Sequence, residues 1–273
     1  MNAKRAMHES WKKLYTEFAG PKTESNFQKT GTLTHKEFLE AGDALVQKVP
    51  VWEWQAGQAD VLPYLPTNKK YLIQRGVACF ERADQDVDDD VAVDDDDWVA
   101  THPNYVPKSK ASVTEKKPMD WSKDEDEDAL GDDDLVQAKP CRMYDVYLVF
   151  DDFYQTPRFF LLGYSEKDHC SVLTRDEMMQ DVYCANREKT VSIDPHPFIK
   201  APCISIHPCR HAETMKVMLT HIKDKLESAQ DEIPEAERVP FLFPTYLSFF
   251  IFLKFISSVV PTIRYDVSFE LDM

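Results

Sequence analysis

The chain has 273 residues, of which 43% are hydrophobic and 12% aromatic, so it is long and apolar enough for one large or two small domains. Its formal net charge is −16, but 19 acidic residues and five lysines between residues 84 and 138 account for −14 of it. Such a segment cannot bury enough apolar surface to offset its conformational entropy, which excludes a compact domain there. We therefore predict a disordered acidic insertion over residues 84–138.

The six cysteines are scattered along the chain, and the first residues lack the apolar core of a signal peptide. Because the dense, regular cysteine spacing is missing, the sequence excludes a secreted disulfide scaffold. We expect a cytoplasmic protein with reduced thiols. Only seven glycines are present, and they form no glycine-rich loop that could cradle a nucleotide phosphate.

The first predicted element is an amphipathic helix over residues 3–18, which ends at Gly20 and Pro21. Basic residues occupy its polar side, a distribution typical of helices that lie in the interface of an anionic membrane. The candidate membrane-binding residues are Met7, Trp11, Leu14, Tyr15 and Phe18. The same pattern also suits a helix that packs on the core of the protein, and both interpretations stay open.

The next predicted helix spans residues 34–49, where Thr34 and Glu37 have the spacing of a capping box. Runs of β-branched, aromatic and alternating residues predict several strands. These strands cover residues 71–80, 143–150, 158–164 and 190–193. A turn sequence at residues 151–157 separates the second strand from the third, so we expect the two to form a hairpin at the heart of a sheet.

The most apolar run covers residues 246–263, which is just long enough to invite a transmembrane interpretation. Lys254 lies in its middle, at a cost of about 2.5 to 3.5 kcal/mol on insertion scales, and Pro261 breaks its end. We therefore predict a core helix. A polar connector at residues 228–244 precedes it, and a final strand is expected at residues 265–271.

The clearest chemical signal is Cys209, which follows His207 and Pro208 and precedes Arg210 and His211. Proline is tolerated in the first turn of a helix, and the apolar residues that follow recur at helical spacing, so Cys209 should lie at a helix N-terminus. Unpaired backbone N–H groups there, with the arginine and the two histidines, favour the thiolate, which is the nucleophilic form. The alternative is an inert, half-buried cysteine.

Other cysteine chemistries fit the sequence less well. A cysteine phosphatase needs an arginine six positions after the nucleophile, where this chain has Met215. The cysteines and histidines of residues 203–211 lack the paired spacing that surrounds a zinc ion, so we expect no metal. A cysteine protease needs a separate histidine as general base, which the sequence alone cannot place. The candidates are His35, His102, His169, His196 and His221.

Several motifs occur in order along the chain. They are Glu40-Ala41-Gly42-Asp43 with Trp52-Glu53-Trp54, Tyr64-Leu65-Pro66, Tyr154-Gln155-Thr156-Pro157-Arg158, His207-Pro208-Cys209-Arg210-His211-Ala212, and Ile251-Phe252-Leu253-Lys254-Phe255 leading to Val260-Pro261-Thr262-Ile263. Together they resemble the autophagy-related protein 3 family, the ubiquitin-like-conjugating enzymes of autophagy. The resemblance covers most of the chain outside the acidic insertion.

The resemblance implies an α+β fold of the ubiquitin-conjugating-enzyme type, with an antiparallel sheet flanked by helices. Residues 1–20 would then be an amphipathic membrane-sensing helix. Residues 21–83 and 139–273 would form a single conjugating-enzyme-like domain, and residues 84–138 would dock the activating enzyme.

The resemblance also implies that Cys209 accepts the autophagy ubiquitin-like modifier as a thioester from the activating enzyme and transfers it to phosphatidylethanolamine. Further partners would be a ligase-like modifier conjugate complex and a phosphatidylethanolamine-containing membrane. The protein would be cytoplasmic and transiently at autophagic membranes. We expect no cofactor and no nucleic-acid partner.

By the same resemblance, Thr190 is a candidate for tuning the site. Ordinary ubiquitin-conjugating enzymes use an asparagine shortly before the cysteine to stabilise the oxyanion, and residues 199–208 contain none. His207 either holds the loop or moves protons. The connector at residues 228–244 also lacks the tryptophan of the modifier-binding Trp-x-x-Leu motif that some family members carry. The alternative function is a catalytically silent scaffold with the same fold and partners.

Overall fold

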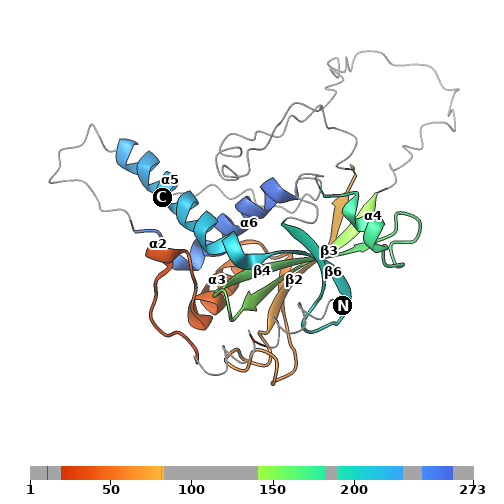
Figure 1. Ribbon diagram of the computed structural model, residues 1–273, viewed down its shortest axis with the longest axis horizontal. Helices are drawn as coiled ribbons and strands as arrows, with labels where there is room; N and C mark the ends of the chain where they lie inside the picture. Colours follow the sequence, from red (N-terminus) through yellow and green to blue (C-terminus); the bar gives the residue numbers. More distant parts are fainter. Residues whose placement is uncertain are drawn as a thin grey trace, which may run out of the picture.

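The computed structural model describes residues 11, 20–80, 82, 141–182, 190–229 and 242–260. At its centre, six strands form one antiparallel sheet in the order β1-β2-β3-β4-β6-β5 (Figure 1). The strands are β1 Trp52–Gln55, β2 Tyr71–Cys79, β3 Arg142–Asp151, β4 Thr156–Tyr164, β5 Val191–Pro195 and β6 Pro202–Ile206. The predicted α+β architecture, an antiparallel sheet with flanking helices, is confirmed.

The described helices pack around this sheet. They are α2 Phe27–Thr30, α3 His35–Lys48, α4 Arg175–Met179, α5 His211–Ala229 and α6 Ser248–Val259, with the 3₁₀ helices η3 Pro208–Arg210 and η5 Thr245–Leu247. In Figure 1, α2 and α3 lie toward one end of the domain and α4 lies at the other.

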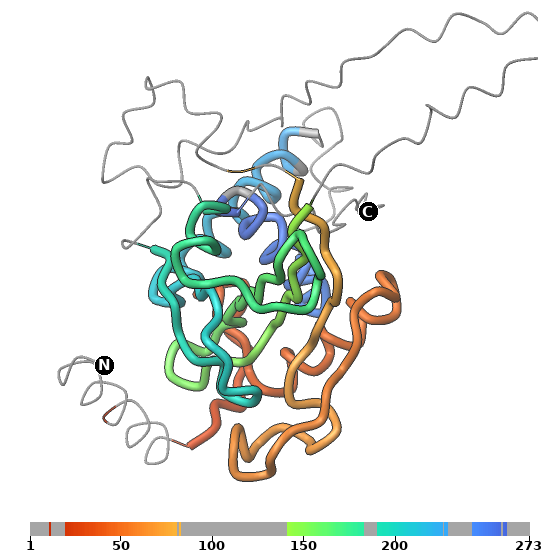
Figure 2. The backbone as a smooth tube through the Cα atoms, turned by 90° about the vertical axis from the view of Figure 1, so that its right-hand side faces the viewer, coloured from red at the N-terminus to blue at the C-terminus, as the bar shows by residue number. Residues whose placement is uncertain are grey.

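The loop between β1 and β2, drawn in orange, lies at the lower edge of the domain in Figures 1 and 2. The side chain of Lys70 is fully buried beneath it. Lys70 Nζ donates hydrogen bonds to the carbonyl oxygens of Leu62 and Leu65, at 2.8 and 2.9 Å. A buried ammonium group therefore stabilises the conformation of this loop, although burial lowers the pKa of Lys70.

Local sequence signals produce the predicted elements with small shifts at their ends. The backbone N–H of Glu37 donates to Thr34 Oγ1 at 3.2 Å, and that of Thr34 donates to Glu37 Oε2 at 2.8 Å, so the capping box is confirmed. The predicted hairpin is β3 and β4, but its turn covers only residues 152–155 because the strands pair up to Asp151 and Thr156. Strands β1 and β6 are missing from the sequence predictions.

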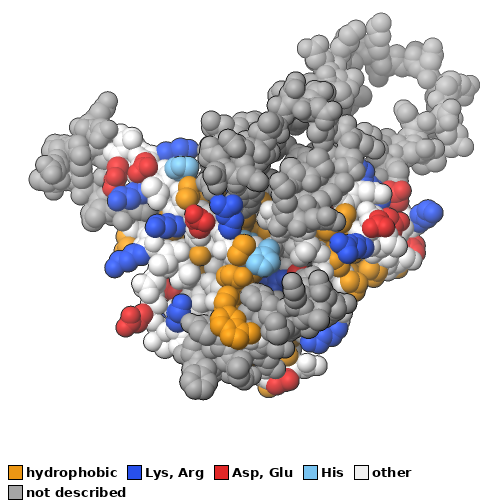
Figure 3. Space-filling view, in the orientation of Figure 1, with side chains coloured by type: hydrophobic (Ala, Val, Ile, Leu, Met, Phe, Trp, Pro, Cys, Tyr) orange, Lys and Arg blue, Asp and Glu red, His pale blue; other side chains and the backbone are white. Residues whose placement is uncertain are grey.

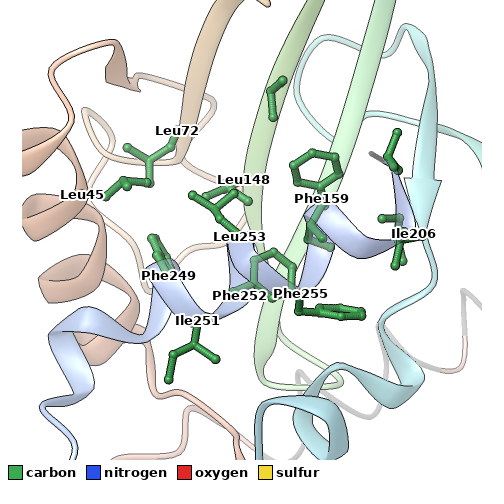
Figure 4. Packing of buried hydrophobic residues seen from close by; sticks show 14 of the residues in the cluster. Leu45, Leu72, Leu148, Phe159, Ile206, Phe249, Ile251, Phe252, Leu253 and Phe255 are labelled. Atoms are coloured by element: carbon green, nitrogen blue, oxygen red, sulfur yellow. The ribbon is translucent and has the colours of Figure 1, made fainter. Parts of the chain in front are cut away.

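The most apolar run forms a core helix, as predicted. Phe249 and Phe252 of α6 are fully buried, whereas Lys254 on the same helix is exposed. Figure 4 shows α6 between Leu45 of α3 and Phe159 of β4, so the helix joins the α3 side of the core to the sheet. Nowhere in the described ranges is a helix long and apolar enough to cross a bilayer.

A buried carboxylate joins the two points of the chain that flank the acidic insertion. Asp181 is fully buried, and its Oδ2 accepts hydrogen bonds from Arg142 Nη1 at 2.9 Å and from Tyr144 Oη at 2.5 Å. Its Oδ1 lies 3.4 Å from Nε of Arg82. The chain therefore leaves the sheet after β2 and returns to β3 beside the same acidic residue.

Several predicted segments lie outside the described residues. They are the helix of residues 3–18 apart from Trp11, the acidic insertion at 84–138, residues 230–241 of the connector predicted at 228–244, and the strand at 265–271. On the face shown in Figure 3, acidic and basic side chains are intermingled. This mixture agrees with the small net charge of the chain outside the insertion.

Candidate active site

Cys209 lies in the 3₁₀ helix η3, between the end of β6 and the start of α5. Pro208 occupies the first helical position, where a missing N–H is no loss and a fixed φ suits a helix. The chain turns there from strand to helix, and the side chain of Cys209 is exposed. The prediction was wrong in one detail: a separate 3₁₀ turn precedes α5, which begins only at His211.

His207 caps the turn that carries Cys209. Its Nδ1 accepts a hydrogen bond from the backbone N–H of Cys209 at 3.2 Å, so a neutral imidazole in this bond carries its proton on Nε2. The edge of its ring meets the ring of Tyr154, with the centroids 5.7 Å apart. These contacts orient the imidazole and satisfy one of the free N–H groups of the helix start.

Thr190 lies across the strand pair from His207. β5 and β6 pair from Pro195 and Pro202 to Val191 and Ile206, and the backbone N–H of His207 then donates to the carbonyl of Thr190 at 2.9 Å. The fold therefore brings the two candidate residues together beside the turn that carries the cysteine. The effect of the Thr190 side chain on the reaction stays a prediction.

His211 has a structural role instead of the electrostatic one expected from the sequence. Its side chain is buried against Phe252 and Phe255, and its Nδ1–H donates to the carbonyl of Pro157 at 3.0 Å. Burial lowers the pKa of His211 to about 3, so the ring is neutral at pH 7. The expectation that both histidines and Arg210 place positive charge around the thiol is therefore wrong for His211.

The cysteines differ sharply in exposure. Cys79 and Cys203 are buried, and burial raises the pKa of Cys203 to about 12, which keeps that thiol protonated. Cys141 is half-buried, whereas Cys170 and Cys209 are exposed. Of the cysteines that the structure describes, only these two exposed thiols are open to a large protein substrate, and Cys209 is the one that lies at a helix start beside a histidine.

The described residues bear on two of the rival chemistries, a metal site and a cysteine protease. Across the described ranges, no group of three or more His, Cys, Asp or Glu side chains could hold a metal ion. His35 pairs with Asp152, with Nε2 and Oδ1 2.6 Å apart, and His196 is buried among aromatic rings on the other face of the sheet. His102 lies outside the described residues.

Among the candidate membrane-binding residues, only Trp11 is described. Its side chain is 53% exposed, and the edge of its ring contacts Phe153 in the β3–β4 turn, with the centroids 5.9 Å apart. Met7, Leu14, Tyr15 and Phe18 lie outside the described residues. Half of the Trp11 surface is therefore open to solvent even where the residue touches the domain.

Two contacts around the cysteine were not predicted, namely Tyr154 with His207 and Pro157 with His211. Tyr154 and Pro157 belong to the motif of residues 154–158, which supports the family resemblance but was assigned no role at the site. No other feature of the sequence pointed to these two contacts, because they form only when the β3–β4 hairpin lies beside η3 and α5.

The sequence matches a known protein family over most of its length. Residues 37–267 match the family described as autophagocytosis associated protein, active-site domain. The chain is 34% identical to autophagy-related protein 3 of Arabidopsis thaliana, over 98% of this chain and 96% of the relative. It is 29% identical to proteins of the same name from Saccharomyces cerevisiae and Dictyostelium discoideum, over 97% and 98% of this chain and 99% and 98% of the relatives.

The matched range contains the sheet, α5, α6 and the turn with Cys209. The resemblance noted from the motifs is therefore confirmed by a match that extends across the fold. The chain belongs to the autophagy-related protein 3 family and is a ubiquitin-like-conjugating enzyme of autophagy.

Proposed function

We propose that this chain carries the autophagy ubiquitin-like modifier as a thioester on Cys209 and transfers it to the amine of phosphatidylethanolamine. The observation that carries the proposal is the exposure of Cys209 in a 3₁₀ turn capped by His207, while Cys79 and Cys203 are buried. A nucleophile that receives a protein tag must be open to solvent and held in a fixed turn.

Two acyl transfers make up the reaction. The thiolate of Cys209 first attacks the carbonyl carbon of the thioester between the modifier and the activating enzyme, whose own sulfur leaves as the new C–S bond forms. The amine of phosphatidylethanolamine then attacks the same carbonyl carbon. The sulfur of Cys209 leaves as the amide bond forms, and the amine releases its proton. Neither step needs a cofactor.

The residues around Cys209 act by positioning. His207 holds the turn through its bond to the Cys209 N–H and through its contact with Tyr154, which favours loop support over proton transfer. His211 ties the start of α5 to β4. Thr190 is the remaining candidate for tuning the site from the adjacent strand.

The other partners follow from the segments around the domain. We propose that the acidic insertion at residues 84–138 docks the activating enzyme and that residues 1–20 bind membrane through the apolar side that includes Trp11. A ligase-like modifier conjugate complex would assist the transfer. The protein would then be cytoplasmic and transiently at autophagic membranes that contain phosphatidylethanolamine.

A trapping assay tests the proposal. The chain is incubated with the activating enzyme, ATP and the modifier, and adducts are separated on non-reducing gels. Wild type should form an adduct that thiols remove, and Cys209→Ser should form an ester that survives thiol treatment. The matched control is Cys170→Ser, which replaces the other exposed cysteine and leaves Cys209 in place. This variant should load like wild type.

The outcomes of this assay separate the two candidate functions. If neither wild type nor Cys209→Ser forms an adduct, the proposal is wrong. A wild-type chain that binds the modifier without forming an adduct would instead be a scaffold.

A further inference from the structure

A small hollow lies between the segment that precedes α3 and the β3–β4 turn. Its volume is about 140 Å³. The polar residues that line it include Lys22, Glu24, Asn26, Thr30, Thr32 and Gln155. Alternate residues of the segment 22–26 face this space, while Ser25 between them donates a hydrogen bond to Glu37 on α3.

Two sequence neighbours of the lining residues contact the segment around Cys209. Gly31, between the lining residues Thr30 and Thr32, lies so close to the first turn of α5 that a Cβ on it would be 2.0 Å from the carbonyl oxygen of Ala212. On the other side, Gln155 follows Tyr154, whose ring contacts His207. The hollow is therefore connected to the segment that carries the cysteine through Gly31 and Tyr154.

The charged groups of the hollow are available to a ligand. Thr30 Oγ1 is 2.7 Å from Thr32 Oγ1 and donates to the carbonyl of Asn26 at 3.0 Å, and Gln155 Nε2 donates to the carbonyl of Asp152. Lys22 and Glu24, in contrast, make no hydrogen bond or ion pair with any other residue that the structure describes. One cation and one carboxylate therefore face the same space, beside hydroxyl and amide groups that can donate or accept.

The size and charge of the hollow select the class of ligand. Pockets for drug-sized molecules measure about 300 to 1,000 Å³, so the present space suits only a small polar group. Glu24 would repel a free phosphate, and Lys22 would repel a simple amine. A zwitterion with an anionic and a cationic end satisfies both.

We propose that this hollow binds the phosphoethanolamine headgroup of the acceptor lipid, with the phosphate at Lys22 and the ammonium group at Glu24. The inference rests on the proposed function, because the headgroup is that of the lipid that accepts the modifier from Cys209. Lys22 also follows directly on the predicted membrane helix, which would bring the hollow to the headgroup layer. Binding there raises the local concentration of the amine before it loses its proton and reacts.

The experiment separates loading from transfer. Wild type and variants are first loaded at Cys209, the activating enzyme is stopped, and the loss of the thioester is followed after an amine is added. The acceptors are soluble glycerophosphoethanolamine, ethanolamine without phosphate, and vesicles of phosphatidylcholine with phosphatidylethanolamine. The variants are Lys22→Gln and Glu24→Gln, and the matched controls are Lys29→Gln and Glu40→Gln, whose side chains do not line the hollow.

Loading should be the same in all variants. Lys22→Gln should slow the discharge to glycerophosphoethanolamine about threefold, which lies within the range expected for an exposed charge pair, and should not change the discharge to ethanolamine. Glu24→Gln should slow both, because both acceptors carry the ammonium group. The two controls should behave like wild type with every acceptor.

Three results would overturn the inference and leave the proposed function standing. The first is normal discharge of Lys22→Gln and Glu24→Gln to glycerophosphoethanolamine. The second is equal inhibition of wild-type discharge by inorganic phosphate and by glycerophosphocholine, since this would indicate a site for any simple anion. The third is slower discharge of Lys22→Gln with vesicles only, together with weaker binding of this variant to vesicles in a flotation assay. That result would assign Lys22 to membrane attachment. Failure of wild type to load would instead contradict the proposed function itself.

Discussion

His211 and Pro157 connect the first residue of α5 to strand β4 through a hydrogen bond of 3.0 Å from Nδ1–H to the carbonyl oxygen. The bond is buried beneath Phe252 and Phe255 of α6. Because Cys209 lies only two residues before His211, this contact fixes where the turn with the thiol emerges from the sheet. Its loss should be felt both in stability and at the site.

The variant His211→Phe keeps a ring in the core but leaves the carbonyl of Pro157 without its donor. The free energy of unfolding should fall by about 1 to 3 kcal/mol, the cost of a buried group without its partner. Urea denaturation measures this loss. His211→Asn keeps a donor and should recover part of the stability, and equal stability of the two variants would contradict the assignment.

Stability should fall in mild acid because two histidines are buried in the neutral form. Burial lowers the pKa of both His196 and His211 to about 3, from an unfolded value of 6.5. Below pH 6.5 the unfolded chain binds protons that the folded chain does not, so the free energy of unfolding decreases as the pH falls. Each histidine should contribute a loss of about 2 kcal/mol between pH 7.5 and pH 5.

Urea denaturation of variants at these two pH values measures the effect. His196→Asn keeps an acceptor for the N–H groups of Phe198 and Ile199, which bond to His196 Nδ1, and should reduce the pH dependence by one histidine's share. Wild type, measured at the same two pH values, provides the reference. An unchanged slope in His196→Asn would show that another group titrates.

The Asp181 cluster should be a main source of stability where β2 ends and β3 begins. Asp181→Asn keeps the shape of the side chain but leaves the buried Arg142 without its carboxylate, which costs about 3 to 5 kcal/mol. Thermal and urea unfolding measure the loss. Glu166 pairs with Arg82 at the surface, so Glu166→Gln should cost less than about 1 kcal/mol. Similar losses in both variants would be inconsistent with a buried cluster.

Thiol labelling of the folded chain should follow exposure. A soluble thiol reagent, read out by peptide mass spectrometry, should modify Cys209 and Cys170 well before Cys79 and Cys203. The comparison with Cys170 matters because both side chains are exposed. A faster reaction of Cys209 would therefore be caused by the turn in which it lies and not by its solvent exposure. Slow labelling of Cys209 in the folded protein would exclude its proposed role.

Replacing Trp11 and Leu14 with Asp should abolish binding to small vesicles and lipid transfer, because charge on the apolar side prevents insertion into the interface. Loading of Cys209 should persist. Trp11 also contacts Phe153, so Phe153→Leu serves as a control that removes the ring contact without adding charge. An equal loss of loading in the double variant would make the helix part of the core.

The elements that the sequence predicted well are those with strong local signals. The Thr34 capping box, the β3–β4 hairpin and the apolar α6 depend on residues close together in the chain. β6 was missed because its five residues begin with Pro202 and are held by pairing with β4 and β5, which no local pattern reveals. β1 has only four residues.

The site could be predicted only in part, for a related reason. Pro208 before Cys209 is a local signal, and it predicted the thiol at the start of a helix, where the structure has the 3₁₀ turn that leads into α5. The neutral state of His211 depends on Phe252 and Phe255, which follow some forty residues later in the chain. Its charge could not be deduced from its neighbours in sequence, because the burial that decides it comes from the tertiary fold.

Because Arg82 and Arg142 both contact Asp181, the domain itself holds together the two points between which the insertion lies in the sequence. For a flexible loop in general, each doubling of the length costs only about 0.6 kcal/mol of closure entropy. The position is therefore one where evolution or an engineer can add, remove or exchange dozens of residues with almost no strain on the sheet. A whole recognition module could be grafted there while the chemistry at the opposite helices continues unchanged.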